Sequence, residues 1–110
     1  MLEPETELIL GRIKSLAVSE AYRVTLHAQQ EMVEEGIRLD EVLEALQRAE
    51  MLEHYPQHRR GACCLIFGPT AQGRPLHLVC TTAQLLLILI TVYEPRPPKW
   101  ETPRKRSSPP

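Results

Sequence analysis

The stretch "LLLILITVY", residues 85–93, decides the fold because it is the most apolar part of the 110-residue chain. Successive side chains of a strand point to opposite faces of a sheet, and here both alternating sets are apolar as far as Ile90. A strand of this kind is typical of an inner position with both faces covered. One set turns polar only at Thr91 and Tyr93. We therefore expect residues 85–93 to form the centre of a sheet.

Four other runs have the composition of strands. They are "YRVTLH" (residues 22–27), "MLEHYP" (51–56), "ACCLIF" (62–67) and "PLHLVCT" (75–81). Turn-forming stretches such as "GPTAQGR" (68–74) and "TTAQ" (81–84) separate the later runs. Because short turns join antiparallel neighbours, the second half of the chain should be an antiparallel sheet.

The remaining apolar residues recur with the period of helices. Residues 3–18 carry apolar side chains on one helical face. Thr25 can cap a helix over residues 26–35, which Gly36 would end. The clearest amphipathic pattern, at i, i+3, i+4 and i+7, consists of Leu39, Val42, Leu43 and Leu46. The last two helices should form a hairpin.

Together these elements predict an α+β fold, with an N-terminal helix and a helical hairpin packed on one face of a small, mainly antiparallel sheet of four to five strands. The residues that should be buried together are Leu43, Leu46, Ile88 and Ile90. Residues 1–20 would be a helical extension and residues 21–101 the α+β domain. Residues 102–110 would be a disordered basic tail rich in proline and serine.

Composition limits the class of protein. A chain with 43% hydrophobic and 25% charged residues suits one globular domain. The N-terminus "MLEPETELIL" has acids where a secretory signal has bases. The longest apolar run of the whole chain is far shorter than the ~20 residues that span a bilayer. We therefore expect a cytoplasmic protein without a membrane span.

The cysteines and histidines lack the spacing of a metal site. Cys63 and Cys64 are adjacent in a strand-like run, so their side chains should point to opposite faces. The chain has neither a CxxC pair nor an HxxxH pair on a predicted helix. We expect no disulfide framework, no bound metal and no cofactor.

Charge is divided unevenly along the chain. Residues 31–53 hold eight acids and only Arg38 and Arg48 as bases, so the predicted helical hairpin would repel phosphate. Residues 95–110 hold five basic residues and one acid. Such a tail either contacts phosphate or a partner, or is a solvated terminus.

Four motifs carry a resemblance to a known family. They are "TLHAQQEMVEEGI" (25–37), "DEVLEAL" (40–46), "RPLHLV" (74–79) and "TVYEPRPPKW" (91–100). In this order and spacing they resemble the bacterial domain-of-unknown-function 4258 family over residues 22–101. That family looks like a member of the RelE/ParE/BrnT-like toxin superfamily, whose fold is a helical pair on a small antiparallel sheet. The chain departs from the family at Glu31 and Glu35, where members often carry arginine.

The resemblance implies the toxin of a bacterial type II toxin–antitoxin system, a RelE-like endoribonuclease that acts on mRNA without metal. Such cleavage needs a base, cations that stabilise phosphorane charge, and an acid. The candidate proton carriers are His77, Tyr93 and His27, and the candidate phosphate-binding residues are Arg59, Arg60, Arg74 and Lys99. The implied partners are a cognate antitoxin, of the YgiT zinc-finger type or a similar small protein, and mRNA or the ribosome.

Several candidates also fit structural roles. His27 would then be a hydrogen-bonding residue at a helix start, Tyr93 a packing residue at a strand end, and Arg59 and Arg60 solvated loop residues.

The position of His77 depends on strand register. In one register its side chain shares an open face with Tyr93, and in the other it points into the core with Ile88. We expect the open face, because an unpaired buried imidazole is costly.

The segment "TVYEPRPPKW" (91–100) should form the rim of the functional surface. Pro95 ends ladder pairing, Trp100 anchors the segment near the sheet, and Lys99 contacts phosphate or carboxylate. The alternative to an endoribonuclease is a non-catalytic interaction module of the same fold, either a ParE-like protein inhibitor or a domain that has lost its activity. The acidic Glu31 and Glu35 favour that alternative.

Overall fold

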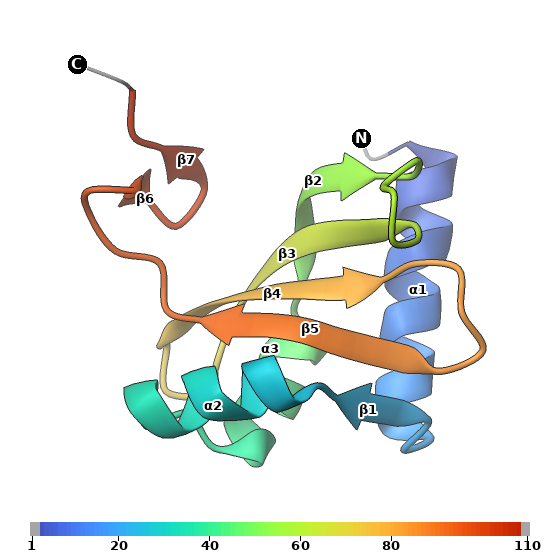
Figure 1. The fold of residues 1–110 in the computed structure, drawn as a ribbon, viewed down its shortest axis with the longest axis horizontal. Coiled ribbons are helices and arrows are strands. Elements are labelled where there is room, and N and C mark those ends of the chain that lie inside the picture. Colours follow the sequence, from blue (N-terminus) through green and yellow to red (C-terminus); the bar gives the residue numbers. More distant parts are fainter. Residues whose placement is uncertain (1–2, 109–110) are drawn as a thin grey trace.

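The computed structural model describes residues 3–108, which form three helices and seven strands. In chain order these are α1 (Pro4–Val18), β1 (Tyr22–Val24), α2 (Leu26–Glu35), α3 (Leu39–Gln47), β2 (Glu50–Tyr55), β3 (Cys63–Pro69), β4 (Pro75–Thr81), β5 (Leu87–Tyr93), β6 (Trp100–Thr102) and β7 (Lys105–Arg106). The main sheet has the strand order β1-β5-β4-β3-β2, and β6 pairs with β7 in a small second sheet (Figure 1).

The predicted α+β architecture is confirmed. β1 runs parallel to β5, and the other neighbours in the main sheet are antiparallel. The centre of the sheet is β4, however, because β5 lies between β4 and the short edge strand β1. The expectation that residues 85–93 are central is therefore wrong by one strand.

The ends of α2 follow from its sequence. The hydroxyl of Thr25 accepts a hydrogen bond from the N–H of Ala28 at 3.1 Å, as expected of a cap. The helix ends at Gly36, whose φ of 63° lies in the left-handed region that favours glycine. In the same way α1 begins with Pro4 in its first turn, where a missing N–H costs nothing.

One face of the main sheet packs against the helices to form the core. Its buried residues are Leu10, Ile13, Ala17, Ala28, Val42, Ala45 and Leu46 from the helices, and Cys64, Ile66, Leu76, Leu78, Cys80, Leu87, Leu89 and Val92 from the strands. Because α1 contributes to this core, residues 3–20 pack as part of the domain, while residues 1–2 lie outside the described residues. At Gly68 a β-carbon would come within 2.0 Å of the carbonyl oxygen of Ala45, so α3 lies directly on the backbone of β3.

A β-bulge at Ile90 changes the expected facing of β5. Val79 pairs with Thr91, but Cys80 pairs with Leu89, so Ile90 is an extra residue in the strand. An extra residue reverses the alternation of faces on either side of it.

The helix-facing residues of β5 are consequently Leu87, Leu89 and Val92, and the expectation that Ile88 and Ile90 face the helices is wrong. Val92 follows the bulge and lies on the expected face. Strict alternation back from Val92 would place Ile88 and Ile90 on the helix-facing side. Because Ile90 is an extra residue, Leu87 and Leu89 lie on that side instead. Ile88 and Ile90 are partly exposed.

The other face of the main sheet is covered at one end by the hairpin of β6 and β7. Trp100 is only 2% exposed, as expected of an anchor. The expectation of a disordered tail is wrong for residues 102–108, because Arg104 and Arg106 pair with Glu50 and Glu53 of β2. Composition alone does not reveal such pairs with a distant strand. Residues 109–110 lie outside the described residues.

Substitutions in β5 test the bulge. Leu89→Ala should lower the free energy of unfolding by about 2–5 kcal/mol, because a fully buried leucine leaves a cavity under the helices. Ile88→Ala should lower it clearly less, because its side chain is partly exposed. Urea unfolding followed by far-UV circular dichroism measures both, and a larger loss for Ile88→Ala would contradict the assignment.

Candidate functional site

β4 and β5 bring His77 and Tyr93 side by side. The two residues are paired in register, and the Tyr93 hydroxyl oxygen lies 3.1 Å from Nδ1 of His77. His77 therefore lies on the face of Tyr93, as expected from the sequence. The expectation that this face is open is wrong, because His77 has no exposed surface.

The hydrogen bonds of His77 define its protonation. Nε2 lies 2.6 Å from the carbonyl oxygen of Pro103. A carbonyl only accepts, so Nε2 carries the proton and Nδ1 accepts from the Tyr93 hydroxyl. Burial lowers the pKa of His77 and raises the pKa of Tyr93. The pair is thus a neutral imidazole and a neutral phenol at neutral pH.

Aromatic rings and guanidinium groups enclose this pair. The Trp100 ring packs edge-on against His77, with the ring centres 4.4 Å apart. The guanidinium carbon of Arg106 lies 4.6 Å from the centre of the Trp100 ring, and that of Arg104 lies 4.9 Å from the centre of the Phe67 ring. Arg106 is also close enough for its charge to lower the pKa of both His77 and Tyr93, although burial has the larger effect on each.

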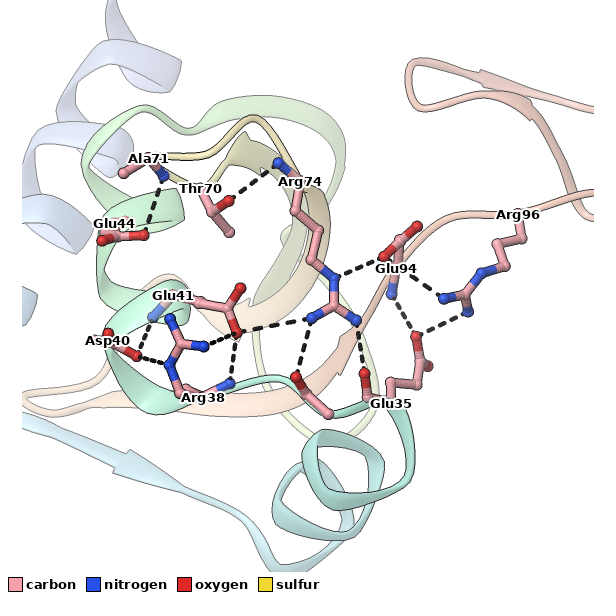
Figure 2. Close-up of polar contacts among 11 residues, drawn as sticks. Glu35, Arg38, Asp40, Glu41, Glu44, Thr70, Ala71, Arg74, Glu94 and Arg96 are labelled. Carbon is pink, nitrogen blue, oxygen red and sulfur yellow. Dashed lines mark hydrogen bonds and ion pairs between the residues drawn. The ribbon is translucent and has the colours of Figure 1, made fainter.

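Arg74 occupies a different place, at the junction of α2, α3 and β5 (Figure 2). Its Nε donates to Glu94 at 2.7 Å. Its Nη2 and Nη1 donate to the backbone carbonyls of Glu35 and Gly36, at 2.7 and 3.1 Å. These carbonyls end α2 and lack partners within the helix, so Arg74 acts as a C-terminal cap.

Glu31 and Glu35 of α2 bind the backbone of β5 and of Glu94, the residue that follows it. Glu31 accepts a hydrogen bond from the N–H of Val92 at 3.0 Å, and Glu35 accepts one from the N–H of Glu94 at 2.9 Å. Glu35 also pairs with Arg96 at 3.1 Å. The glutamates at these positions therefore have a structural use that sequence reasoning missed. The signal in the sequence was a matching spacing. Glu31 and Glu35 are one helical turn apart, which is close to the distance between two alternate residues of a strand, such as Val92 and Glu94.

The remaining predicted residues lie on other elements. His27 is exposed at the start of α2, with Nε2 3.3 Å from Glu31. Arg59 and Arg60 lie in the exposed loop between β2 and β3. Lys99 is exposed just before β6, and its charge adds to the lowering of the His77 pKa, which is mainly due to burial. The structure thus brings His77 and Tyr93 together with Lys99 nearby, and places Arg74, His27, Arg59 and Arg60 elsewhere.

The cysteines are distributed over both faces of the sheet, as alternation predicts. Cys64 and Cys80 face the helices with their Sγ atoms 4.0 Å apart, and Cys63 lies next to Cys64 on the strand. Within residues 3–108 no group of three or more His, Cys, Asp or Glu side chains is placed to hold a metal ion. The absence of bound metal stays a prediction.

An apolar hollow beside β1 was not predicted. It has a volume of about 590 Å³ and is lined by Arg23, Val24, Gln29, Met32, Val33, Ile37 and Leu39. Val33 is 84% exposed, and a shallower hollow continues from it over Leu26. The signal in the sequence was that Leu26 and Val33 are apolar residues outside the buried face of α2. We call this surface the β1–α2 groove.

The helices of residues 3–108 do not combine the length and apolar character that crossing a bilayer requires.

Comparison with protein-family models assigns most of the chain to a family. A family model described as "Domain of unknown function (DUF4258)" matches residues 24–94, which is more than half of the 110-residue chain. α1 and the β6–β7 hairpin lie outside the matched residues. No curated protein and no solved structure matches the chain.

Arg74→Ala tests whether this residue is structural. The substitution should lower the free energy of unfolding by about 2–3 kcal/mol, because it removes charge-assisted hydrogen bonds from partly buried acceptors. Arg38→Ala is the matched control, since Arg38 pairs with Asp40 at the exposed surface and should matter far less. Equal effects in urea unfolding would contradict the capping role.

Proposed function

The chain belongs to the domain-of-unknown-function 4258 family, and from its geometry we propose that it is a protein-binding module of the toxin–antitoxin type. In this proposal it acts as ParE-like inhibitors do, by binding a partner protein in the cytoplasm, and it does not cleave RNA.

The dispersal of the predicted catalytic residues carries the proposal. Metal-independent RNA cleavage needs cations aimed at the phosphate where charge develops. Arg74 is engaged by Glu94 and by the end of α2, and it does not contact His77 or Tyr93 among the hydrogen bonds of residues 3–108. The imidazole itself is enclosed under Trp100.

The β1–α2 groove supports a protein partner. Apolar side chains exposed together mark interaction surfaces more often than isolated ones do. The groove also adjoins β1, an edge strand of the sheet, where a partner strand could add by backbone hydrogen bonds. We propose that the partner at this surface is the cognate antitoxin, a YgiT-type zinc-finger protein or a similar small protein.

The charges near this surface argue against RNA as the ligand. The α2–α3 region carries most of the eight acids found between residues 31 and 53. Acidic side chains repel phosphate, whereas a protein partner is not excluded by them.

A RelE-like endoribonuclease that acts on mRNA or at the ribosome is the second candidate. The observation in its favour is the hydrogen bond between His77 and Tyr93, which joins two groups able to transfer protons. It requires that the covering hairpin move away and that a cation be supplied to the pair.

Induced expression separates the two candidates. We expect growth arrest that co-expression of the adjacent gene product relieves, and purified protein that leaves RNA intact. Val33→Asp should abolish binding of that product, and growth arrest should then no longer be relieved by its co-expression, because the substitution places a charge in the apolar groove. Leu8→Asp is the matched control, an exposed apolar residue of α1 that should tolerate the change.

Tyr93→Phe gives the opposite test, because it removes only the hydroxyl. Arrest should persist in this variant if binding is the mechanism. Cleavage of RNA by the purified protein, lost in Tyr93→Phe, would support the endoribonuclease and contradict our proposal. Growth unaffected by induction would contradict the toxin part of it.

A further inference from the structure

We propose that the hairpin of β6 and β7 is a releasable latch over His77 and Tyr93, which acid and salt open. This inference does not depend on the proposed function, and the hairpin lies outside the residues that match the family.

Two ion pairs hold the latch at its rim. Arg104 binds both carboxylate oxygens of Glu50, at 2.6 and 3.1 Å. Arg106 binds both oxygens of Glu53, at 2.7 and 2.9 Å. These two-point contacts fix the orientation of the hairpin on β2 as well as its position.

A β-bulge in β2 makes this double attachment possible. Residues 50 and 53 would face opposite sides of a regular strand. Here Met51 pairs with Ile66 and Glu53 with Leu65, so Leu52 is an extra residue and both glutamates face the hairpin. The strand is thus shaped to receive the two arginines.

The ion pairs are accessible to solvent, which makes the latch sensitive to salt. The side chain of Arg104, which pairs with Glu50, is 64% exposed, and that of Arg106, which pairs with Glu53, is 47% exposed. Ions screen charges that are exposed to this degree. High ionic strength should therefore favour the open hairpin.

The inner contacts of the latch are incompletely satisfied. Nε1 of Trp100 is buried, and although it lies near enough to the Tyr93 hydroxyl to lower the pKa of Tyr93, it makes no well-formed hydrogen bond within residues 3–108. Water would accept this hydrogen bond in the open state, so the orphaned donor favours opening. The ion pairs at the rim act together with the buried Trp100 ring and the His77–Pro103 hydrogen bond to hold the latch closed.

Several groups face His77 and decide how it responds to acid. They are Tyr93 of β5, Phe67 of β3, Glu53 of β2, Arg106 of β7, and Lys99, Trp100 and Pro103 of the hairpin segment. Burial is the main reason that the pKa of His77 lies below its ordinary value, and the charges of Arg106 and Lys99 add to it. The Pro103 carbonyl and Glu53 act in the opposite direction.

The lowered pKa of His77 in the closed state decides whether acid opens or closes the latch. When the hairpin opens, His77 meets water and regains its ordinary pKa of about 6.5. Below that pH the open state binds more protons than the closed state, so acidification favours opening. The Arg106 hydrogen bond lowers the pKa of Glu53 to about 2, so that ion pair persists through the range in which His77 titrates.

Trp100 is the single tryptophan of the chain and reports on the latch directly. The 110-residue chain is titrated from about pH 7.5 to about pH 5 while tryptophan emission and acrylamide quenching are recorded. We expect a red shift and a several-fold rise in quenching at acid pH, reached at higher pH in concentrated salt. Far-UV circular dichroism should stay unchanged, because the main sheet and helices remain folded.

Two substitutions identify the groups responsible. His77→Gln should remove the pH dependence of Trp100 quenching, whereas His54→Gln, which replaces a histidine of β2 outside the latch, should keep it. Arg106→Gln should open the latch at neutral pH. Lys105→Gln is its matched control, because Lys105 pairs only with Glu101 of the same hairpin among the ion pairs of residues 3–108, and it should stay closed.

Three results would overturn the proposal. One is a Trp100 that stays protected at acid pH and in high salt, and another is exposure that coincides with loss of the circular dichroism signal. The third is equal opening in Lys105→Gln and Arg106→Gln. If His77→Gln does not fold, the arginine and lysine variants still decide the matter.

Discussion

The outer edge of β5 is the constraint on which the rest of the structure depends. β1 pairs with β5 only as far as Leu89, so the next backbone groups need other partners. The Thr25 hydroxyl donates to the carbonyl of Ile90 at 3.0 Å, and the carboxylates of Glu31 and Glu35 accept the N–H groups beyond it. α2 thus takes the place of a neighbouring strand along this edge.

Docking α2 in this way determines what is free for function. Its acidic side chains are used by the sheet, and Arg74 is used to end the helix and to bind Glu94. Val33 is left facing outward, beside the edge strand β1. The same contacts therefore remove candidate phosphate ligands and produce the apolar groove that favours a protein partner.

Much of this fold could be predicted from the sequence, because its signals are local. Helical periodicity, the Thr25 cap and the left-handed Gly36 were enough to place α2, and apolar runs between turns were enough to place the strands. The bulges at Leu52 and Ile90 could not be predicted, since an extra residue leaves no mark in an alternating pattern. They decide which side chains of β2 and β5 share a face.

The site was predictable only in part. Pairing of β4 with β5 was enough to suggest that His77 and Tyr93 meet. Their burial depends on residues 100–106, which reach β2 through ion pairs between positions more than fifty residues apart, and a proline-rich basic composition conceals such pairs.

The central claim is that His77 is a neutral, buried residue and that the face it shares with Tyr93 is closed. Long-range ¹⁵N–¹H NMR of the imidazoles at neutral pH tests this most directly. The structure predicts that His77 is a pure Nε2–H tautomer whose ring proton exchanges slowly with water, because it donates to the Pro103 carbonyl. A rapidly exchanging mixture of tautomers, as in an exposed histidine, would contradict the account.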